Sequence, residues 1–498
     1  MNRQIARLAL IGLGLIAALI VGTTYWQTWA TASLNDRQDN EIQRVAQFSI
    51  KRGLIRAADG TILATNVRKR IGGQTLYFRR YPQGALFGAV VGYSTQSRAR
   101  SGLESSENDY LTGSNTNLKT VIDRTLDKLR GATIKGNTLW LTMRPSAQRV
   151  AMQQLNGKCG AAVAVDIRTG AVLVMATRPT YDPNLVESNF SRITNRARSA
   201  PCSPTSPLLN RATAGLFVPG SSFKVVTATA ALDSGRYSID SRFVDRGYCI
   251  EYGKEVQNFG DQNGPERFGP VSFLQALQHS INAVFCDVGK AIGARSILNA
   301  AKRYGFYKSP PLETPENERP PSGLYNHGRL FNPSRPQFQV DPGRLAFGQE
   351  RMLVTPLQMA MVAAGVANHG VVMRPYVVQR VTAPDGSVIS RTKPHKYRRA
   401  MKTSTAAALN EMMQAVVTGG TGTAAEIPGV RVAGKTGTAE TGGPGTPNTT
   451  WFIAFAPADA PRYAVAVVLQ NQTETGGTTA APIAKEILQA LLAGRSNP

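Results

Sequence analysis

The sequence predicts an α+β protein with one antiparallel sheet, assembled from distant segments and flanked by helices. Strand-like segments gather near residues 160–176 and again near 451–469, and helix-like segments fill the chain between them. Strands so placed bury their apolar faces most simply in one sheet covered by helices. A smaller, mainly β module is expected before this larger one, so we divide the chain into residues 27–140 and 141–495. The 498 residues are enough for such a division, and 42% hydrophobic residues are typical of a globular protein.

The first residues predict a membrane anchor. Residues 1–7 hold two arginines and no acid, and residues 8–26 are uncharged and mostly apolar. Trp26 and Trp29 stand where an interfacial aromatic belt would lie. We therefore expect the first segment in the cytoplasm, the second in the membrane, and the rest of the chain outside the cell. A cleaved signal peptide, with a cleavage site at Ala30-Thr31-Ala32, is the alternative.

The N-terminal module is expected to contain short strands and one helix. Residues 51–64 predict two strands joined by an Asp-Gly turn, and residues 75–81 and 137–143 predict two more. Residues 101–111 predict a helix, and the polar residues 35–43 predict a juxtamembrane helix or linker.

The larger module is expected to open with a helix and a hairpin. Its predicted elements are the helix 145–155, the hairpin 160–176, helices at 225–232, 273–289, 355–370, 406–417 and 480–492, and strands at 451–455 and 463–469. Residues 309–342 are rich in proline and polar residues and predict a long loop.

Charge and cysteine content restrict the partners. With 57 Lys+Arg against 32 Asp+Glu the net charge is +25, which suits nucleic acid, an acidic lipid surface or a polyanionic cell wall. The basic residues are scattered and no zinc-finger or RNP spacing occurs, so we expect no nucleic-acid partner. Four cysteines on an exported chain permit two disulfides; Cys249–Cys286 and Cys159–Cys202 are possible pairings. With four histidines and no His-Glu-x-x-His, we expect no metal and no cofactor.

Ser221 and Lys224 form the first candidate catalytic motif. Pro219-Gly220 breaks the chain and an apolar helical run follows, which places Ser221 near a helix start. Lys224 lies about one turn later, so its amine and the serine hydroxyl can form a nucleophile–base pair. A Ser-x-x-Lys pair alone is a weak signal, because a capped helix beside a solvated lysine has the same pattern.

Two further motifs supply the remaining groups that acyl transfer requires. In Ser280-Ile281-Asn282, the serine could relay a proton to the leaving group, and Asn282 could hold Lys224 or a substrate amide. Lys435 of Lys435-Thr436-Gly437 could lower the pKa of Lys224, which must be neutral to act as the base, and attract a substrate carboxylate.

The residues after Lys435 are expected to bind substrate. The Thr436 and Thr438 hydroxyls can bind a carboxylate, and Gly437 lets a substrate backbone approach a strand edge. Backbone N–H groups of Ser221 and Thr438 are the predicted oxyanion hole. His279 is expected to be structural, because on a helix it would point about 100° away from Ser280.

These three motifs, in this order, resemble those of the penicillin-binding transpeptidases. Other stretches similar to this family are Asn210-Arg211-Ala212, Gly348-Gln349, Thr355 to Ala360, Ala367 to Gly370, Trp451-Phe452 and Ala480-Ala481-Pro482. Arg52-Gly53, Asp59-Gly60, Leu63-Ala64 and Gly102-Leu103-Glu104 resemble the pedestal of class B, the monofunctional transpeptidases. Length and a single anchor agree with the short actinobacterial penicillin-binding protein A type. Ala57-Ala58 and Glu350 depart from the family pattern, outside the three motifs.

The resemblance implies a penicillin-binding and serine β-lactamase-like fold and no cofactor. It implies a peptidoglycan stem peptide ending in D-Ala-D-Ala as substrate, acylation of Ser221 with loss of D-alanine, and transfer to an amine of a neighbouring stem. β-Lactams would acylate the same serine. Residues 27–140 are too few for a glycosyltransferase module, so a partner polymerase of the RodA/FtsW type is implied, in elongation or division.

Three other activities are compatible with the same motifs. A D,D-carboxypeptidase would pass the acyl group to water. A serine β-lactamase would need a water activator such as Glu-x-x-Leu-Asn, and the chain has none between Ser280 and Lys435. A non-catalytic β-lactam sensor or division scaffold would be expected to carry a larger cytoplasmic part than residues 1–7.

Overall fold

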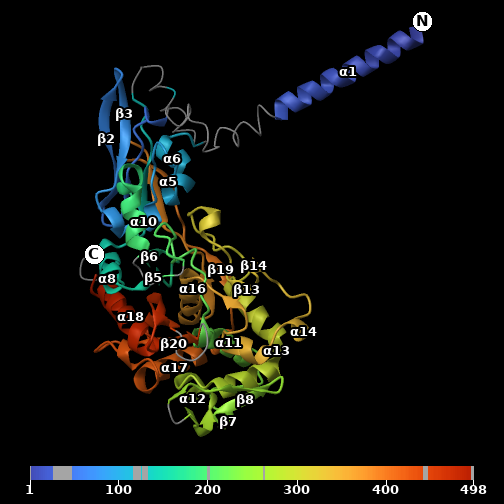
Figure 1. The fold of residues 1–498 in the computed structure, drawn as a ribbon, viewed down its shortest axis with the longest axis vertical. Helices are drawn as coiled ribbons and strands as arrows, with labels where there is room; N and C mark the ends of the chain where they lie inside the picture. The colour runs from blue at the N-terminus through green and yellow to red at the C-terminus, as the bar shows by residue number, and fades with distance from the viewer. Residues whose placement is uncertain are drawn as a thin grey trace.

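A five-stranded antiparallel sheet lies at the centre of the C-terminal part of the chain (Figure 1). The structure, a computed structural model, describes residues 2–25, 47–115, 125, 133–198, 202, 204–261, 264–440 and 447–494. The strands stand in the order β20 (Ala433–Glu440), β21 (Asn448–Ala456), β22 (Tyr463–Gln472), β5 (Cys159–Asp166), β6 (Val172–Arg178). Every neighbouring pair is antiparallel, which confirms the predicted sheet of distant segments.

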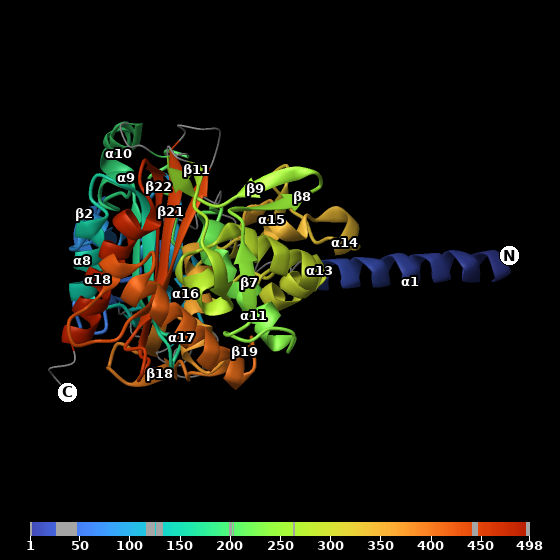
Figure 2. The ribbon, with the colours of Figure 1, turned by 90° about the horizontal axis from the view of Figure 1, so that it is seen from below.

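Both faces of this sheet are covered by helices, and Figure 2 shows the sheet between the two layers. One layer holds α11 (Lys224–Asp233), α16 (Pro356–Ala367) and α17 (Thr403–Gly419), and the other holds α8 (Pro145–Gln154) and α18 (Gly476–Ala493). Alternate residues of one strand point into opposite cores: Val163 packs with the first layer, and Ala162 and Ala164 pack with the second. The inner strand β5 is therefore apolar and buried from Cys159 to Val165, because neither of its faces meets water.

The predicted helix 273–289 is wrong at its centre. The structure has α12 (Phe273–Gln278) and α13 (Asn282–Tyr304), separated by a break at residues 279–281. Ser272 and Gln275 form a capping box that starts α12. Ser280 has a φ of 59°, in the left-handed region, and this conformation ends the helix.

The long loop predicted at 309–342 contains short elements. These are η4 (Glu316–Glu318), β13 (Gly323–Asn326), β14 (Arg329–Leu330), α14 (Pro336–Gln339) and the start of α15 (Pro342–Ala346). Further short elements are β7 (Arg242–Asp245), β8 (Tyr248–Glu251), β9 (Lys254–Gln257), β10 (Gly260–Asp261), β11 (Gly264–Pro265), β12 (Gly269–Ser272), β15 (Met352–Leu353), β16 (Val371–Met373), β19 (Lys396–Arg399), η3 (Gly220–Phe223) and η5 (Thr423–Ala425).

The N-terminal module is organised around a six-stranded sheet. Its order is β18 (Val388–Arg391), β17 (Val378–Thr382), β4 (Thr138–Leu141), β1 (Ile55–Arg56), β2 (Ile62–Ile71), β3 (Gln74–Arg80). Two of these strands, β17 and β18, come from far along the chain, so the two modules share this sheet. The helices of this module are η2 (Gly84–Leu86), α4 (Gly88–Val91), α5 (Gly102–Ser106) and α6 (Asn108–Thr112). In the larger module, α9 (Leu185–Ser188) and α10 (Phe190–Arg198) follow β6.

The chain begins with helix α1 (Asn2–Tyr25). Within the described residues, no helix combines the length and the apolar character that crossing a membrane requires. The anchor expected at residues 8–26 therefore stays a prediction. Trp26, Trp29, the alternative cleavage site at 30–32 and the linker at 35–43 lie outside the described residues.

The structure joins the cysteines in the two pairs considered from the sequence. Cys159 at the start of β5 is bonded to Cys202, and Cys249 in β8 to Cys286 in α13. The Cα atoms are 5.4 and 6.3 Å apart. Among the described residues, the one group of potential metal ligands is Cys249, Glu251 and Cys286, whose ligand atoms lie within 4.8 Å of one another. The two cysteine sulfurs of this group are bonded to each other.

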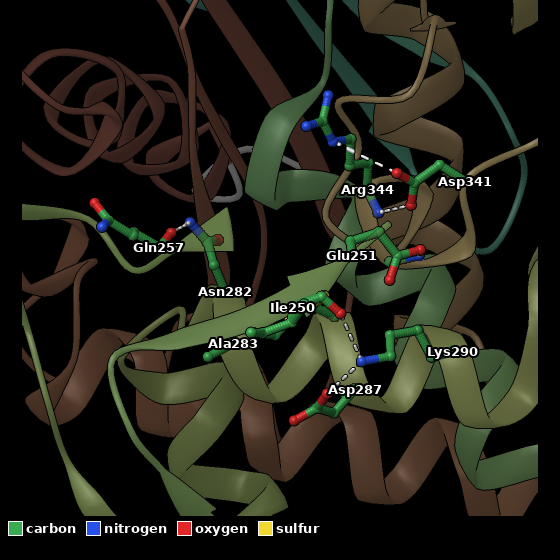
Figure 3. The surroundings of a disulfide bond; sticks show 12 residues. Ile250, Glu251, Gln257, Asn282, Ala283, Asp287, Lys290, Asp341 and Arg344 are labelled. Atoms are coloured by element: carbon green, nitrogen blue, oxygen red, sulfur yellow. Dashed lines mark hydrogen bonds and ion pairs between the residues drawn. A yellow bond between two sulfur atoms is a disulfide. The ribbon is translucent and has the colours of Figure 1, made fainter. Parts of the chain in front are cut away.

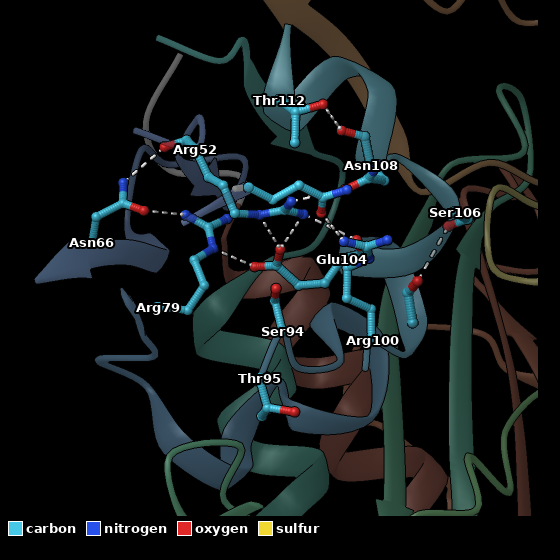
Figure 4. Close-up of polar contacts among 12 residues, drawn as sticks. Arg52, Asn66, Arg79, Ser94, Thr95, Arg100, Glu104, Ser106, Asn108 and Thr112 are labelled. Carbon is cyan, nitrogen blue, oxygen red and sulfur yellow. Dashed lines mark hydrogen bonds and ion pairs between the residues drawn. The ribbon is translucent and has the colours of Figure 1, made fainter. Parts of the chain in front are cut away.

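A buried ion cluster holds the N-terminal module together (Figure 4). The Glu104 carboxylate, 0% exposed, accepts from Arg52 Nη2 at 2.8 Å and from Arg79 Nε at 2.6 Å. Burial by itself raises the pKa of Glu104, but the two guanidinium groups outweigh it and bring the pKa below its usual value. Glu104 of α5 therefore ties together the start of the module and strand β3.

Glu104→Gln should destabilise the fold by about 3 kcal/mol or more, because it leaves two buried guanidinium groups without a counter-charge. Calorimetric unfolding measures the effect. The matched control is Asp287→Asn, which breaks an exposed ion pair with Lys290 at 3.1 Å and should cost less than about 1 kcal/mol. Equal losses in the two variants would contradict the importance of the buried cluster.

Candidate active site

Ser221 lies in η3, one short turn before α11 begins at Lys224. The segment before it is held by Trp451, whose Nε1 donates to Val218 O at 2.9 Å. Gly220 has a φ of 50°, and a Cβ there would meet Thr438 O at 2.7 Å. Only glycine combines this backbone conformation with so close an approach to β20. The Pro-Gly break predicted from the sequence therefore brings Ser221 against the edge of the sheet.

Lys224 is buried at the base of the site. Its Nζ donates to Ser280 O at 2.5 Å and to Asn282 Oδ1 at 2.7 Å. Burial, and then the charge of Lys435, lower the pKa of the Lys224 amine well below its usual value. A neutral amine has two N–H donors and one lone pair, and the two acceptors use both donors. The lone pair is left to receive a proton.

Lys435 lies on the other side of Ser280. Its Nζ donates to Ser280 Oγ at 2.9 Å and to Thr436 O at 3.0 Å. Burial lowers the pKa of Lys435 to about 7. The Ser280 hydroxyl, 3.3 Å from Lys224 Nζ, therefore lies between two amines and can pass a proton between them and a bound substrate.

The left-handed backbone of Ser280 makes this arrangement possible. Its carbonyl oxygen accepts from Lys224 and its hydroxyl lies 3.3 Å from the same amine. A residue inside a continuous helix could not offer both oxygens, because its carbonyl would be engaged in the helix. Such a conformation costs about 1–3 kcal/mol for a residue other than glycine. The break between α12 and α13 is thus part of the site.

Strand β20 carries Lys435 to Thr438 along the edge of the sheet. A Cβ on Gly437 would meet Pro219 O at 2.9 Å and Ser222 N at 3.0 Å. Gly437 is therefore needed for the turn that carries Ser221 to pack against β20, and its expected role toward substrate stays a prediction. β20 has no strand on its outer edge within the described residues, so its outward-facing backbone groups are available to a bound peptide.

A cavity of about 480 Å³ opens in front of these groups. The motif residues that line it are Ser221, Ser280, Asn282, Thr436 and Thr438. Lys224 and Lys435 lie behind them, with both side chains 0% exposed. All three sequence motifs thus meet at one cavity.

Other lining residues were not recognised in the sequence. They include Glu255, Glu266, Phe268, Arg344, Thr421 and Thr475. Thr421 Oγ1 lies 2.6 Å from Thr436 Oγ1 and so extends the predicted pair of threonine hydroxyls. No motif marked Thr421, because only the fold brings the end of α17 to β20.

The structure departs from the expected site at two points. The Lys224 amine has no hydrogen bond to Ser221 among the described contacts, although the two residues are one turn apart. His279 lies in the break and not on a helix face; it lines the cavity and its ring stacks on Phe268 at 5.1 Å. No contact in the described part of the chain joins His279 to Ser221, so the geometry gives no Ser-His pair.

The motifs and the sheet agree with a known family. Residues 160–489 match the penicillin binding protein transpeptidase domain. The chain belongs to this family. Residues 52–139 also match the penicillin binding protein A dimerisation domain, which covers most of the N-terminal module.

Similar proteins extend over the whole chain. A protein of Mycolicibacterium smegmatis named peptidoglycan D,D-transpeptidase PbpA is 34% identical and aligns over 99% of each chain. A protein of the same name from Mycobacterium tuberculosis is 33% identical, over 99% of this chain and 100% of that one. The solved penicillin-binding protein A from M. tuberculosis, a ceftriaxone acyl-enzyme complex, has a TM-score of 0.79 at 32% identity, over 90% of this chain and 100% of that chain.

Ser280→Ala should slow acylation by a β-lactam about 10²- to 10⁴-fold, because it removes the hydroxyl between Lys224 and Lys435. Stopped-flow measurement of the acylation rate tests this. The control is Ser234→Ala just after α11, far from the cavity. Its hydroxyl donates to Ala231 O and accepts from Arg236 N, and neither partner lines the cavity, so the rate should be unchanged. A normal rate in Ser280→Ala would exclude a role for this hydroxyl in proton transfer.

Proposed function

We propose that this protein is a peptidoglycan D,D-transpeptidase that cross-links stem peptides through an acyl-enzyme on Ser221. The observation that carries the proposal is the buried Lys224, which lies one turn after Ser221 and whose amine donates hydrogen bonds to Ser280 and Asn282. A lysine kept neutral in this way is suited to take a proton from a hydroxyl nucleophile. The family match and the relatives named D,D-transpeptidase support the same activity.

In the proposed first step, Ser221 Oγ attacks the carbonyl carbon of the D-Ala-D-Ala bond and Lys224 accepts the hydroxyl proton. The developing oxyanion is stabilised by the backbone N–H groups of Ser221 and Thr438. The C–N bond then breaks, the leaving D-alanine receives a proton through Ser280, and an ester to Ser221 remains. In the second step an amine of a neighbouring stem attacks this ester, forms the cross-linking amide and frees Ser221.

Substrate binding is assigned to the edge strand. A peptide lying along the free edge of β20 would form backbone hydrogen bonds as an added strand. Lys435, Thr436 and Thr438 would hold the terminal carboxylate. Asn282 would hold the Lys224 amine. A β-lactam has the same reactive amide and carboxylate, and a relative is solved as the acyl-enzyme of imipenem, so we propose that β-lactams acylate Ser221 here too.

The competing activities differ in the acceptor or in turnover. A D,D-carboxypeptidase would release the acyl group to water, and a serine β-lactamase would do so rapidly with an activated water. A sensor or scaffold would bind without cross-linking. Relatives named transpeptidase that align over almost their whole length favour an amine acceptor and catalysis.

We further propose that residues 1–7 are cytoplasmic, 8–26 anchor the protein in the cell membrane, and the modules 27–140 and 141–495 lie outside. Large apolar side chains of α1 are exposed, for example Leu10 at 70% and Val21 at 69%, and residues 8–26 carry no charge. Lipid would cover such side chains. A membrane glycosyltransferase of the RodA/FtsW type is the proposed partner that supplies glycan strands for elongation or division.

Ser221→Ala should abolish covalent labelling by a fluorescent penicillin in membranes, because it removes the hydroxyl that forms the proposed acyl-enzyme. Ser222→Ala is the matched control. Its buried hydroxyl bonds only to Pro219 O at 2.8 Å, so labelling should persist. Labelled Ser221→Ala protein would refute the assigned nucleophile.

Incubation with a donor stem peptide and an amine acceptor separates the competing activities. We expect a cross-linked product together with free D-alanine. Release of D-alanine without any cross-link, at every acceptor concentration, would identify a carboxypeptidase instead. Rapid release of hydrolysed penicillin would identify a β-lactamase.

A further inference from the structure

Asn258, which directly follows β9, joins three segments near the active site. Its Nδ2 donates to Asp245 Oδ1 at 3.1 Å, to Asp245 Oδ2 at 3.0 Å and to Glu266 O at 2.9 Å. Its Oδ1 accepts from Ala283 N at 2.9 Å. Asp245 ends β7 and Ala283 is the second residue of α13. Asn258 is 7% exposed and Asp245 3% exposed. The catalytic steps proposed above use neither residue.

The orientation of the Asn258 amide is determined by its partners. A carboxylate can only accept, so the NH₂ group must face Asp245 and the oxygen must face α13. Asp245 is itself fixed, because it accepts from Gly247 N at 3.0 Å and from Phe268 N at 2.9 Å. Asn258 N also donates to Gly247 O at 2.9 Å.

This amide supports the turn that carries Asn282. The first N–H groups of a helix have no acceptor within the helix, and Ile281 at the N-cap of α13 provides none from its side chain. Asn258 Oδ1 supplies the acceptor for Ala283 N. Gln257 O, one residue earlier, accepts from Asn282 Nδ2 at 3.1 Å, a contact drawn in Figure 3. Asn282 Oδ1 is left facing Lys224 Nζ at 2.7 Å.

We propose that Asn258, held by Asp245, is a positioning residue for catalysis. It fixes the first turn of α13 so that Asn282 Oδ1 keeps its hydrogen bond to Lys224. It lines the cavity but contacts neither Lys224 nor Ser221. Its amide is fully engaged with Asp245, Glu266 O and Ala283 N, so it acts through the turn that carries Asn282. This proposal rests on the proposed function, because it matters only where Lys224 is the base.

The nearby disulfide makes the proposal testable. Cys249 of β8 is bonded to Cys286 of α13, and β8 pairs with β9. The hairpin β8–β9 therefore stays attached to α13 when the Asn258 side chain is removed. A loss of activity in such a variant then reports the placement of the first turn and not the detachment of the hairpin.

The first test is Asn258→Ala in the full chain, with acylation by a fluorescent penicillin followed by stopped flow. The rate of the acylation step should fall about 10- to 100-fold, because the variant loses the acceptor for Ala283 N that fixes the turn carrying Asn282. The dissociation constant of the non-covalent complex should change by less than about threefold. The final amount of labelled protein should equal that of the unmodified chain, since Ser221 is intact.

Asn410→Ala is the matched control. Asn410 in α17 also uses its Nδ2 to hold a backbone oxygen, Ala458 O at 2.8 Å, away from the cavity. Its acylation rate should stay within about twofold of the unmodified chain, because its partners do not touch the motif residues.

In Asn258→Asp, the pH dependence of the acylation rate distinguishes a loss of positioning from a loss of folding stability. The new carboxylate would lie beside that of Asp245, and two close carboxylates raise the pKa of one of them. At low pH a proton shared by the two carboxylates restores the hydrogen bond between positions 245 and 258. At high pH the two negative charges repel each other, and this repulsion displaces the first turn of α13. The acylation rate relative to the unmodified chain should therefore fall as pH rises, in samples whose melting temperature shows them folded. The double variant Asp245→Asn/Asn258→Asp restores a donor and should reduce this dependence.

Rates within twofold of the unmodified chain in both Asn258 variants, over the whole pH range, would overturn the proposal. So would an equal loss in Asn410→Ala. If Asn258→Ala does not fold, the acylation rates of Asn258→Asp at low and high pH are sufficient to test the proposal. Failure of the proposed function looks different: the unmodified chain would then not be labelled at Ser221, or would be labelled and form no cross-link.

Discussion

The Lys224 amine is enclosed by Ser280, Asn282 and Lys435, and the rest of the site depends on that enclosure. Its two hydrogen bonds, at 2.5 and 2.7 Å, use the two donors of a neutral amine. Its burial makes the protonated form unfavourable, and the charge of Lys435 adds to this. A lysine in water would be protonated at neutral pH and unable to accept the proton of Ser221. The catalytic power of the proposed base is therefore a property of its surroundings.

The fold creates those surroundings by joining segments that are far apart in the chain. The sheet brings β20, with Lys435, against the turn of Ser221, and Gly220 and Gly437 allow the two backbones to approach. The break between α12 and α13 turns both Ser280 oxygens toward Lys224. Asn258 and the Cys249–Cys286 disulfide attach the β8–β9 hairpin to α13. Each of these contacts restricts where Asn282 and Ser280 can lie.

The sequence was sufficient for the features that have a local signature. Periodic apolar runs predicted the central sheet and most of the long helices, and three short motifs located Ser221, Ser280 and Lys435. The left-handed φ of Ser280 could not be predicted, because tertiary contacts select it and the surrounding residues have good helical periodicity. Strands of two to four residues such as β7 and β8 are too short to show alternation. Asn258 and Thr421 belong to no motif, and only the fold brings them to the site.

The central claim is that Lys224 is neutral at physiological pH, and the pH dependence of acylation tests it most directly. The second-order rate constant for acylation by a penicillin should be measured on the unmodified chain from pH 5 to pH 10. The account predicts a rate already at its maximum near neutrality, where fewer than about one in a thousand unperturbed lysines would be neutral. The rate should fall on the acid side as Lys224 gains a proton, and fall above about pH 7 as Lys435 loses its charge. A rate that instead rises tenfold per pH unit up to pH 10 would contradict it.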